Sequence, residues 1–139
     1  MNVYFSCSIT GGRDDQAEYA EIVRYLLQQG HEVPTAYLAS LDLDQMEKAV
    51  QAEDIYNRDI AWVRACDALI AEVSTPSHGA GYEIAEAVNK GKPVLCLYKK
   101  GITVSKIITG NNAENYFVWP YANSEEMQHL IHQFLLRIQ

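Results

Sequence analysis

The sequence predicts a single α/β domain over residues 1–139, a three-layer sandwich of the Rossmann or flavodoxin type around a five-stranded parallel sheet. Strand-like and helix-like segments alternate along the chain, which is typical of parallel strands joined by crossover helices. The central strand-like segments are apolar at almost every position, as strands buried on both faces are. A length of 139 residues fits one domain of ordinary size.

Five segments have the composition of strands: residues 2–6, 31–35, 68–73, 93–98 and 116–119. The second of them contains Pro34, which favours an edge position or an early end because proline cannot donate to a strand ladder. The third is a nearly continuous apolar run that only Glu72 interrupts, close to its end. These runs predict strands that are buried in the middle of the sheet.

Six segments are expected to be helical: residues 14–29, 44–51, 53–66, 80–89, 103–109 and 124–138. In the first of them Tyr19, Val23 and Leu26 fall on one face, and Gly30 follows as a stop signal. Ser124 is expected to cap the last helix.

The composition excludes several classes of function. A formal net charge of −7 opposes binding to a nucleic-acid polymer, although one nucleotide phosphate can still be held by backbone N–H groups and a local cation. Without a long apolar run or a signal peptide, the chain is expected to be cytoplasmic and to make no contact with membranes. Cys7, Cys66 and Cys96 fit neither a disulfide framework nor a zinc motif, so no metal is expected.

Ligands of parallel sheets bind at the carboxyl ends of the strands, so the loops that follow the strands carry the candidate site. The loop after the first strand reads Ser8-Ile9-Thr10-Gly11-Gly12-Arg13. Its glycines would let backbone N–H groups approach a phosphate, and Ser8, Thr10 and Arg13 would add donors. The loop matches neither of the common phosphate-binding glycine motifs, and a plain turn is the alternative.

The loop before the helix at residues 80–89 is rich in small residues. Ser77 and the N–H groups from Gly79 to Gly81 would form an anion site at the start of that helix. Glu83 is expected in the first turn, where the helix dipole favours the ionised carboxylate that a nucleophile needs. The structural alternative is that Glu83 only complements the dipole.

Asp59 lies on an apolar stripe with Ile55, Trp62 and Cys66, at spacings of four, three and four residues. A carboxylate there is costly unless it is paired, so Asp59 either pairs with an arginine or a backbone amide, or points into the cleft as a second acid. Two carboxylates suit cleavage of a glycosidic bond, in which one attacks the anomeric carbon and the other assists the leaving group. Tyr4 would point into the same crevice, and an ordinary core tyrosine is its alternative.

Taken together, these segments resemble the 2′-deoxynucleoside 5′-phosphate N-hydrolase family, part of the wider nucleoside 2-deoxyribosyltransferase group. The most specific likeness joins the early Ser-Ile-x-Gly-Gly-Arg loop to the Gly-x-Gly-Tyr-Glu segment at residues 79–83. The likeness covers nearly the whole chain in order, and its other stretches are residues 3–5, 59–62, 71–73, 76–77, 94–97, 105 and 117–119.

The resemblance implies hydrolysis of the N-glycosidic bond of 2′-deoxynucleoside 5′-monophosphates through a glycosyl intermediate on Glu83. It implies that Asp59 contacts the sugar and assists departure of the base, with Tyr4 as the third catalytic residue. The implied substrate contacts are Ser8, Ile9, Thr10, Gly11, Gly12, Arg13, Ser77, Gly79, Gly81 and Ser105. No metal or organic cofactor is implied, and the expected homodimer would place Ser105 of one subunit in the phosphate site of the other.

Three departures from the family pattern leave questions open. Thr10 stands where an arginine is expected, which weakens a strict 5′-phosphate requirement, although Arg13 lies in the same loop. Cys7 stands for a glycine, and Tyr37 for a histidine, which leaves the preferred base open. The rival functions are a deoxyribosyltransferase, a ribonucleotide (CMP-type) N-glycosidase and, from another class, a nucleotide sensor without activity.

Overall fold

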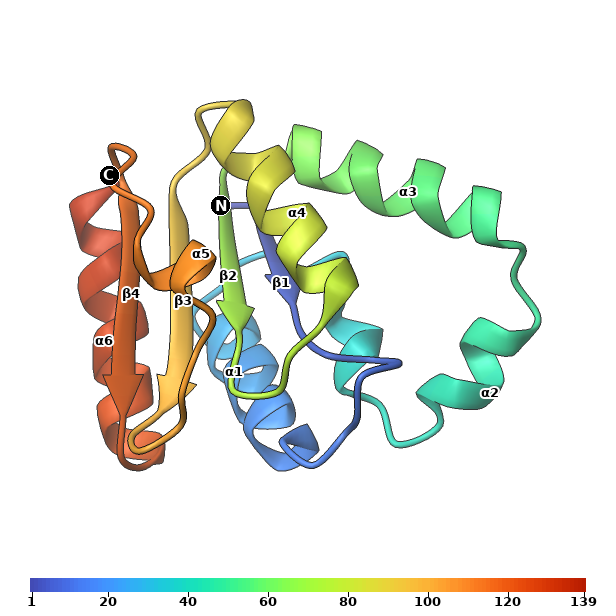
Figure 1. Ribbon diagram of the computed structural model, residues 1–139, viewed down its shortest axis with the longest axis horizontal. Helices are drawn as coiled ribbons and strands as arrows, with labels where there is room; N and C mark the ends of the chain where they lie inside the picture. The colour runs from blue at the N-terminus through green and yellow to red at the C-terminus, as the bar shows by residue number, and fades with distance from the viewer.

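The structure is a computed structural model that describes residues 1–139, apart from the side chain of Asp44. Its four strands, paired side by side in chain order, are β1 (Val3–Ser6), β2 (Ala68–Glu72), β3 (Val94–Lys99) and β4 (Tyr116–Tyr121). All three pairings are parallel. The arrowheads in Figure 1 therefore lie at one edge of the sheet, where the loops that follow β1 and β2 also pass.

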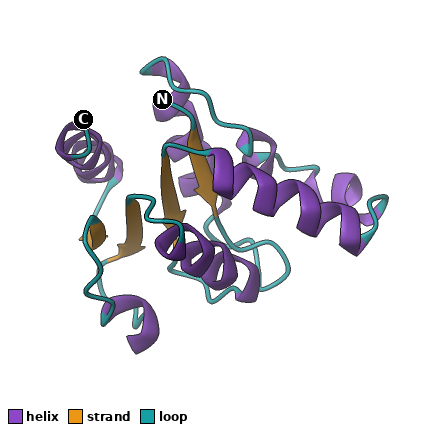
Figure 2. Cartoon of the chain, turned by 90° about the horizontal axis from the view of Figure 1, so that it is seen from above, coloured by secondary structure: helices purple, strands orange, loops and turns teal.

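The helical elements are α1 (Gln16–Gln28), the 3₁₀ turn η1 (Ala36–Ala39), α2 (Leu43–Lys48), α3 (Ala52–Ala65), α4 (His78–Asn89), α5 (Lys106–Thr109) and α6 (Ser124–Arg137). Helices lie on both sides of the sheet, as the view from above shows (Figure 2). One face packs against α1 and α6, and the other packs against α3 and α4. The predicted three-layer α/β sandwich with a parallel sheet is confirmed.

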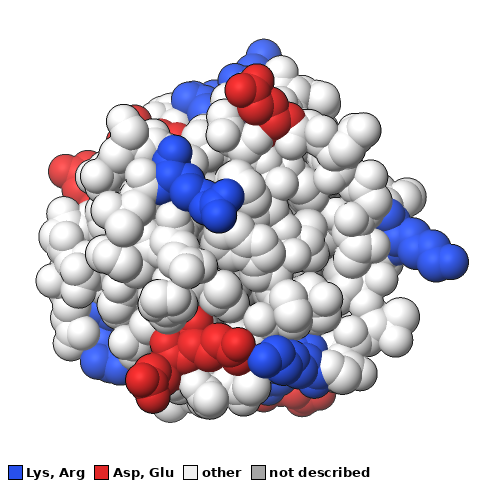
Figure 3. Space-filling model, turned by 90° about the vertical axis from the view of Figure 1, so that its left-hand side faces the viewer, with Lys and Arg blue, Asp and Glu red and all other residues white. Residues whose placement is uncertain are grey.

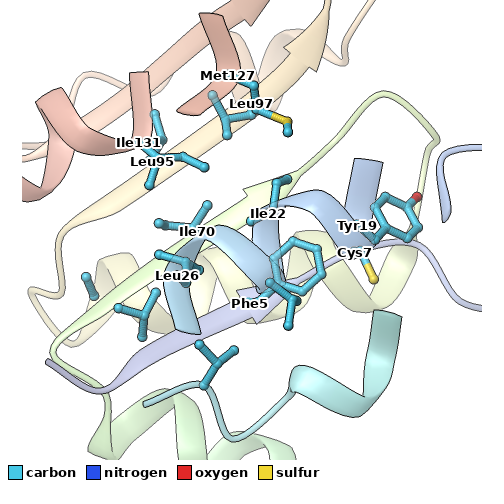
Figure 4. Packing of buried hydrophobic residues seen from close by; sticks show 14 of the residues in the cluster. Phe5, Cys7, Tyr19, Ile22, Leu26, Ile70, Leu95, Leu97, Met127 and Ile131 are labelled. Carbon is cyan, nitrogen blue, oxygen red and sulfur yellow. The ribbon is translucent and has the colours of Figure 1, made fainter. Parts of the chain in front are cut away.

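The alternation of side chains along β1 sends neighbouring residues to opposite faces of the sheet. Phe5 belongs to the core beneath α1 and α6, where it meets Ile22 and Leu26 (Figure 4). Tyr4 belongs to the other core, with Val63 of α3 and Ile84 of α4. This alternation points the Tyr4 ring toward the face on which α3 and α4 lie.

The fifth strand that the sequence predicts between α1 and η1 does not form, so its prediction is wrong. A single parallel bridge joins Asn2 to Glu32. Beyond it Pro34 has no N–H to offer a ladder. The hydroxyl of Thr35 instead accepts a hydrogen bond from the N–H of Phe5 at 3.0 Å and donates one to its carbonyl at 2.7 Å. The Thr35 side chain thus pairs with both backbone groups of Phe5 at the edge of β1, and the chain then turns into η1.

The last helix is capped by Asn123, not by Ser124 as predicted. The Asn123 side chain accepts a hydrogen bond from the N–H of Glu126 at 2.9 Å. Asn123 has the extended backbone that a capping position requires, whereas Ser124 is already helical.

Charged side chains stand in small groups on the face that Figure 3 shows, the side of α6 and β4. Lys100, which follows β3, pairs with Glu126 of α6 at 3.0 Å. Over the described part of the chain, no helix combines the length and the apolar character that crossing a bilayer requires.

Candidate active site

Tyr4, Asp59 and Glu83 meet at the carboxyl end of β1, although they belong to three different elements. Burial raises the pKa of the Tyr4 hydroxyl above its usual range, and the charges of Glu83 and Asp59 raise it further. Asp59 and Glu83 also line one pocket of about 290 Å³ between α3 and α4. Asp59 and Glu83 therefore share one pocket, and the buried Tyr4 lies near both of them.

The sequence pattern of α3 explains how Asp59 reaches this space. Asp59 is only 9% exposed and belongs to the buried stripe of α3, together with Ile60 and Val63. Its carboxylate also accepts a hydrogen bond from Nε of Arg58 at 2.8 Å. Burial raises the pKa of Asp59, and Arg58 opposes that rise. The structure thus combines both alternatives for Asp59, since it is paired with an arginine and still faces Glu83.

The start of α4 differs from the prediction and changes the setting of Glu83. Ser77 is the N-cap, and its hydroxyl accepts a hydrogen bond from the N–H of Ala80 at 3.2 Å. The helix therefore begins at His78, and Glu83 lies in its second turn rather than its first. The influence of the helix dipole is strongest within the first turn, so it does not dominate here.

Burial raises the pKa of Glu83 to about 7, and the neighbouring charge of Asp59 acts in the same direction. The expectation that the ionised form is favoured is therefore corrected. The hydroxyls of Ser6 and Tyr4 lie close enough to lower this pKa as donors, although neither makes a hydrogen bond of full geometry to any described atom. A carboxyl with a pKa near neutrality is poised to change its charge during a reaction.

The loop after β1 packs tightly against the loop after β2. A Cβ atom on Gly11 would collide with the carbonyl oxygen of Pro76, so only glycine fits there. Gly12 adopts a φ of +128°, which also favours glycine. Thr10 is exposed at the tip of the loop, while Ile9 packs against the core beneath α1 and can offer a ligand only its backbone.

Two side chains of this loop carry buried polar atoms that bond to none of the described residues, namely Ser8 Oγ and Arg13 Nη1. The rest of the Arg13 guanidinium is anchored, because Nη2 donates to the carbonyl of Ser40 at 3.0 Å and the group lies 5.6 Å from the centre of the Tyr19 ring. Buried polar atoms are rarely left without a partner in folded proteins. An anion bound under this loop would supply one.

The remaining predicted contacts divide between the two faces of α4. Gly79 lines the pocket that holds Glu83. Ser77 and Gly81 instead line a second pocket of about 220 Å³, together with the exposed Ser105. Within one chain, α4 therefore separates Ser105 and Gly81 from Glu83.

The sequence reasoning missed several residues of the site. Ser6 shares a strand face with Tyr4, and the two-residue repeat of a strand was the signal that would have found it. Tyr56 and Tyr82 form an edge-to-face pair on the wall of the pocket, with ring centres 6.1 Å apart. No sequence pattern pointed to Arg58, because its contacts come from elements far apart in the chain. Within the described residues, no three His, Cys, Asp or Glu side chains gather as a metal site would require.

Comparison with known proteins identifies the family to which the chain belongs. The sequence model of the nucleoside 2-deoxyribosyltransferase family matches residues 3–131. The 5-hydroxymethyl-dUMP N-hydrolase of Mus musculus is 41% identical over 138 residues, which cover 96% of this chain and 79% of that protein. The protein of the same name from Danio rerio is 35% identical over 137 residues, covering 96% and 95%.

Among solved structures, the Clostridium botulinum CMP N-glycosidase superposes with a TM-score of 0.69 at 18% identity, covering 95% of this chain and 99% of that one. The 2-deoxyribosyltransferase of Bacillus psychrosaccharolyticus superposes with a TM-score of 0.62 at 14% identity, covering 92% and 90%. These two likenesses show a shared fold. The family model and the relatives at 41% and 35% identity show that the chain belongs to the nucleoside 2-deoxyribosyltransferase family.

Proposed function

We propose that this protein hydrolyses the N-glycosidic bond of 2′-deoxynucleoside 5′-monophosphates and releases the free base and deoxyribose 5-phosphate. The observation that carries the proposal is the meeting of Glu83 and Asp59 beside Tyr4 at the carboxyl edge of the sheet. The relative that is 41% identical bears the name of an N-hydrolase of 5-hydroxymethyl-dUMP, itself a 2′-deoxynucleoside 5′-monophosphate.

The reaction proceeds in two steps through a covalent intermediate. The Glu83 carboxylate attacks C1′ of the sugar, a bond from its oxygen to C1′ forms, and the bond from C1′ to the base nitrogen breaks with its electron pair leaving on the base. Water then displaces the carboxylate from C1′. Over both steps the hydroxyl of the water goes to C1′ and its proton goes to the base, so Glu83 is regenerated.

Asp59 and Tyr4 surround the reacting sugar in this scheme. Asp59 contacts the sugar and assists departure of the base from the opposite wall of the pocket. The buried Tyr4 hydroxyl lies near the Glu83 carboxyl. The pair of tyrosines on the outer wall, Tyr56 and Tyr82, offers aromatic surface on which a base would stack.

The loop after β1 holds the 5′-phosphate in this proposal. Backbone N–H groups at Gly11 and Gly12 approach the anion, and the unpaired atoms Ser8 Oγ and Arg13 Nη1 complete its hydrogen bonds. Arg13 then supplies the positive charge for the phosphate, because Thr10 stands where the family pattern has an arginine.

The protein is proposed to act as a homodimer in which Ser105 completes the phosphate site of the partner. Ser105 is exposed and lies across α4 from Glu83 of its own chain, so in this proposal it meets a substrate bound at Glu83 from a second copy. Ile107 beside it is 85% exposed, an apolar side chain suited to an interface. Sedimentation velocity is expected to show a dimer at assay concentrations, and a monomer there would remove Ser105 from the site.

The rate at low substrate, kcat/KM, is expected to fall on the acid side of about pH 7. The Glu83 pKa is raised to about 7, and only the ionised carboxylate attacks C1′. The ionised fraction decreases about tenfold for each pH unit below the pKa, and the rate follows it. A profile measured from pH 5 to pH 9 checks this, and a constant kcat/KM between pH 5 and pH 7 would contradict the raised pKa of Glu83.

The test of the function is incubation with a panel of nucleotides, scored by chromatography for free base. The panel contains 2′-deoxynucleoside monophosphates, the matching ribonucleotides, and the deoxynucleosides without phosphate. Base release from the deoxynucleotides without an added acceptor is expected. Release only when a second free base is present would indicate a transferase, release only from ribonucleotides would indicate a CMP-type N-glycosidase, and tight binding without any release would indicate a sensor.

A further inference from the structure

The Arg58 side chain is fixed by contacts with four other residues around the candidate site. Its Nε donates to Oδ1 of Asp59 at 2.8 Å, and its Nη2 donates to Oε1 of Glu47 at 3.3 Å. The guanidinium also lies 5.2 Å from the centres of the Tyr37 and Trp62 rings. These contacts come from η1, α2 and α3, so three elements converge on one cation.

The bond between Arg58 and Asp59 is not a product of helix geometry. Neighbouring residues of a helix point in different directions, and contacts along a helix surface normally join residues three or four apart. The flexible stem of Arg58 lets its guanidinium reach Asp59. Trp62, one turn further on, and Tyr37 of η1 hold the folded side chain in that position.

Resting on the proposed function, we propose that Arg58 is a positioning residue that fixes the Asp59 carboxylate toward the substrate sugar and joins it to η1 and α2. An arginine suits this task, because its planar group stacks on rings while its edge donates to carboxylates. The consequence is that the placement of Asp59 depends on a segment, residues 36–48, that contributes none of the predicted catalytic residues.

The charges around Asp59 explain why a cation is needed there. The titratable groups that face Asp59 are Tyr4 of β1, Tyr37 of η1, Glu47 of α2, Arg58 of α3 and Glu83 of α4. Of these five, Arg58 alone is cationic. The carboxylates of Asp59, Glu47 and Glu83 and the phosphate of an incoming nucleotide would repel one another without it. Arg58 therefore opposes the rise that burial causes in the pKa of Asp59, and its charge limits that repulsion.

A matched control exists on the same helix. Arg64 also donates from Nε to a carboxylate, that of Glu86, at 2.6 Å, and its side chain is 54% exposed against 29% for Arg58. Neither Arg64 nor Glu86 lines the pocket that holds Glu83. Replacing either arginine with methionine keeps the stem and removes the charge, so only the position in the fold differs.

The experiment compares Arg58→Met, Arg58→Lys and Arg64→Met with the wild type. For Arg58→Met, kcat is expected to fall about ten- to a hundredfold because a misplaced catalytic group costs that much, while KM changes far less. The acid limb of its pH profile is expected to move to higher pH. Without Arg58, no other described residue opposes the rise that burial causes in the pKa of Asp59. Arg58→Lys keeps a cation and is expected to recover part of kcat, and Arg64→Met is expected to match the wild type.

Several results would overturn the assignment. If Arg58→Met has the kcat and the pH profile of the wild type, Arg58 is not needed to position Asp59. A profile that moves only on its alkaline side would mean that Asp59 acts as a proton donor rather than as a carboxylate. If Arg58→Met fails to fold, the kcat of Arg58→Lys decides. The lysine keeps the charge but lacks the forked guanidinium, so its kcat is expected to lie below that of the wild type.

The assignment can fail separately from the proposed function. An NMR titration of the Asp59 carboxyl carbon in the wild type and in Arg58→Met needs no turnover. A higher pKa of Asp59 in the variant supports the role of Arg58 even if no nucleotide in the panel is cleaved. Equal values in the two proteins contradict that role even if the wild type is an active hydrolase.

Discussion

Replacing Glu83 with alanine is expected to abolish base release while nucleotide binding survives. The covalent step has no other carboxylate placed to attack C1′ if Asp59 is held by Arg58, so turnover is expected to fall by about 10⁴-fold or more. The phosphate loop does not include Glu83, so affinity for the nucleotide is expected to change little. Chromatography of released base and equilibrium dialysis of the nucleotide measure the two quantities.

The control for this variant is Glu86→Ala. Glu86 lies on α4 three residues further on, but it pairs with Arg64 outside the pocket. Its removal is expected to leave turnover unchanged. Turnover at the wild-type rate in Glu83→Ala would disprove the assignment of the nucleophile, whatever the control shows.

Asp59→Asn is expected to lower turnover by about 10²- to 10³-fold, the usual cost of removing one electrostatic contact that stabilises the transition state. The asparagine has the same shape, so the change removes the charge at Asp59 and its attraction to Arg58 while the packing of α3 is retained. Steady-state assays of base release measure the effect. Asp54→Asn, an exposed residue in the first turn of the same helix, is the control.

An unchanged rate in Asp59→Asn would assign Asp59 to structure alone. Its pairing with Arg58 would then be the whole of its task, and the pocket would need a different second acid. A lower melting temperature without a change in rate would lead to the same conclusion.

The layers of the fold could be predicted because they follow from local patterns. Apolar runs such as residues 94–97 mark strands that are buried on both faces. The fifth strand could not be judged in this way. In place of a strand ladder, the Thr35 hydroxyl pairs with the backbone of Phe5. This contact joins residues 30 positions apart, so no local pattern indicates it.

The candidate site was predictable where a residue broke the pattern of its own element. Asp59 is a charged residue on an apolar stripe of α3, and this conflict predicted it as a site residue from the sequence alone. Glu83 was placed one turn too early because the start of α4 depends on the Ser77 cap, and its pKa was judged from the dipole although burial dominates. Arg58 gave no local signal, because folding alone brings Tyr37 and Glu47 to it.

Mass spectrometry of the acid-quenched reaction tests the central claim most directly. Wild-type protein mixed with a cleaved deoxynucleotide, stopped within one turnover and digested, is expected to carry deoxyribose 5-phosphate as an ester on the peptide that contains Glu83. The same peptide from Glu83→Ala serves as the blank. Release of base with the sugar phosphate attached to another residue of the chain would contradict the account.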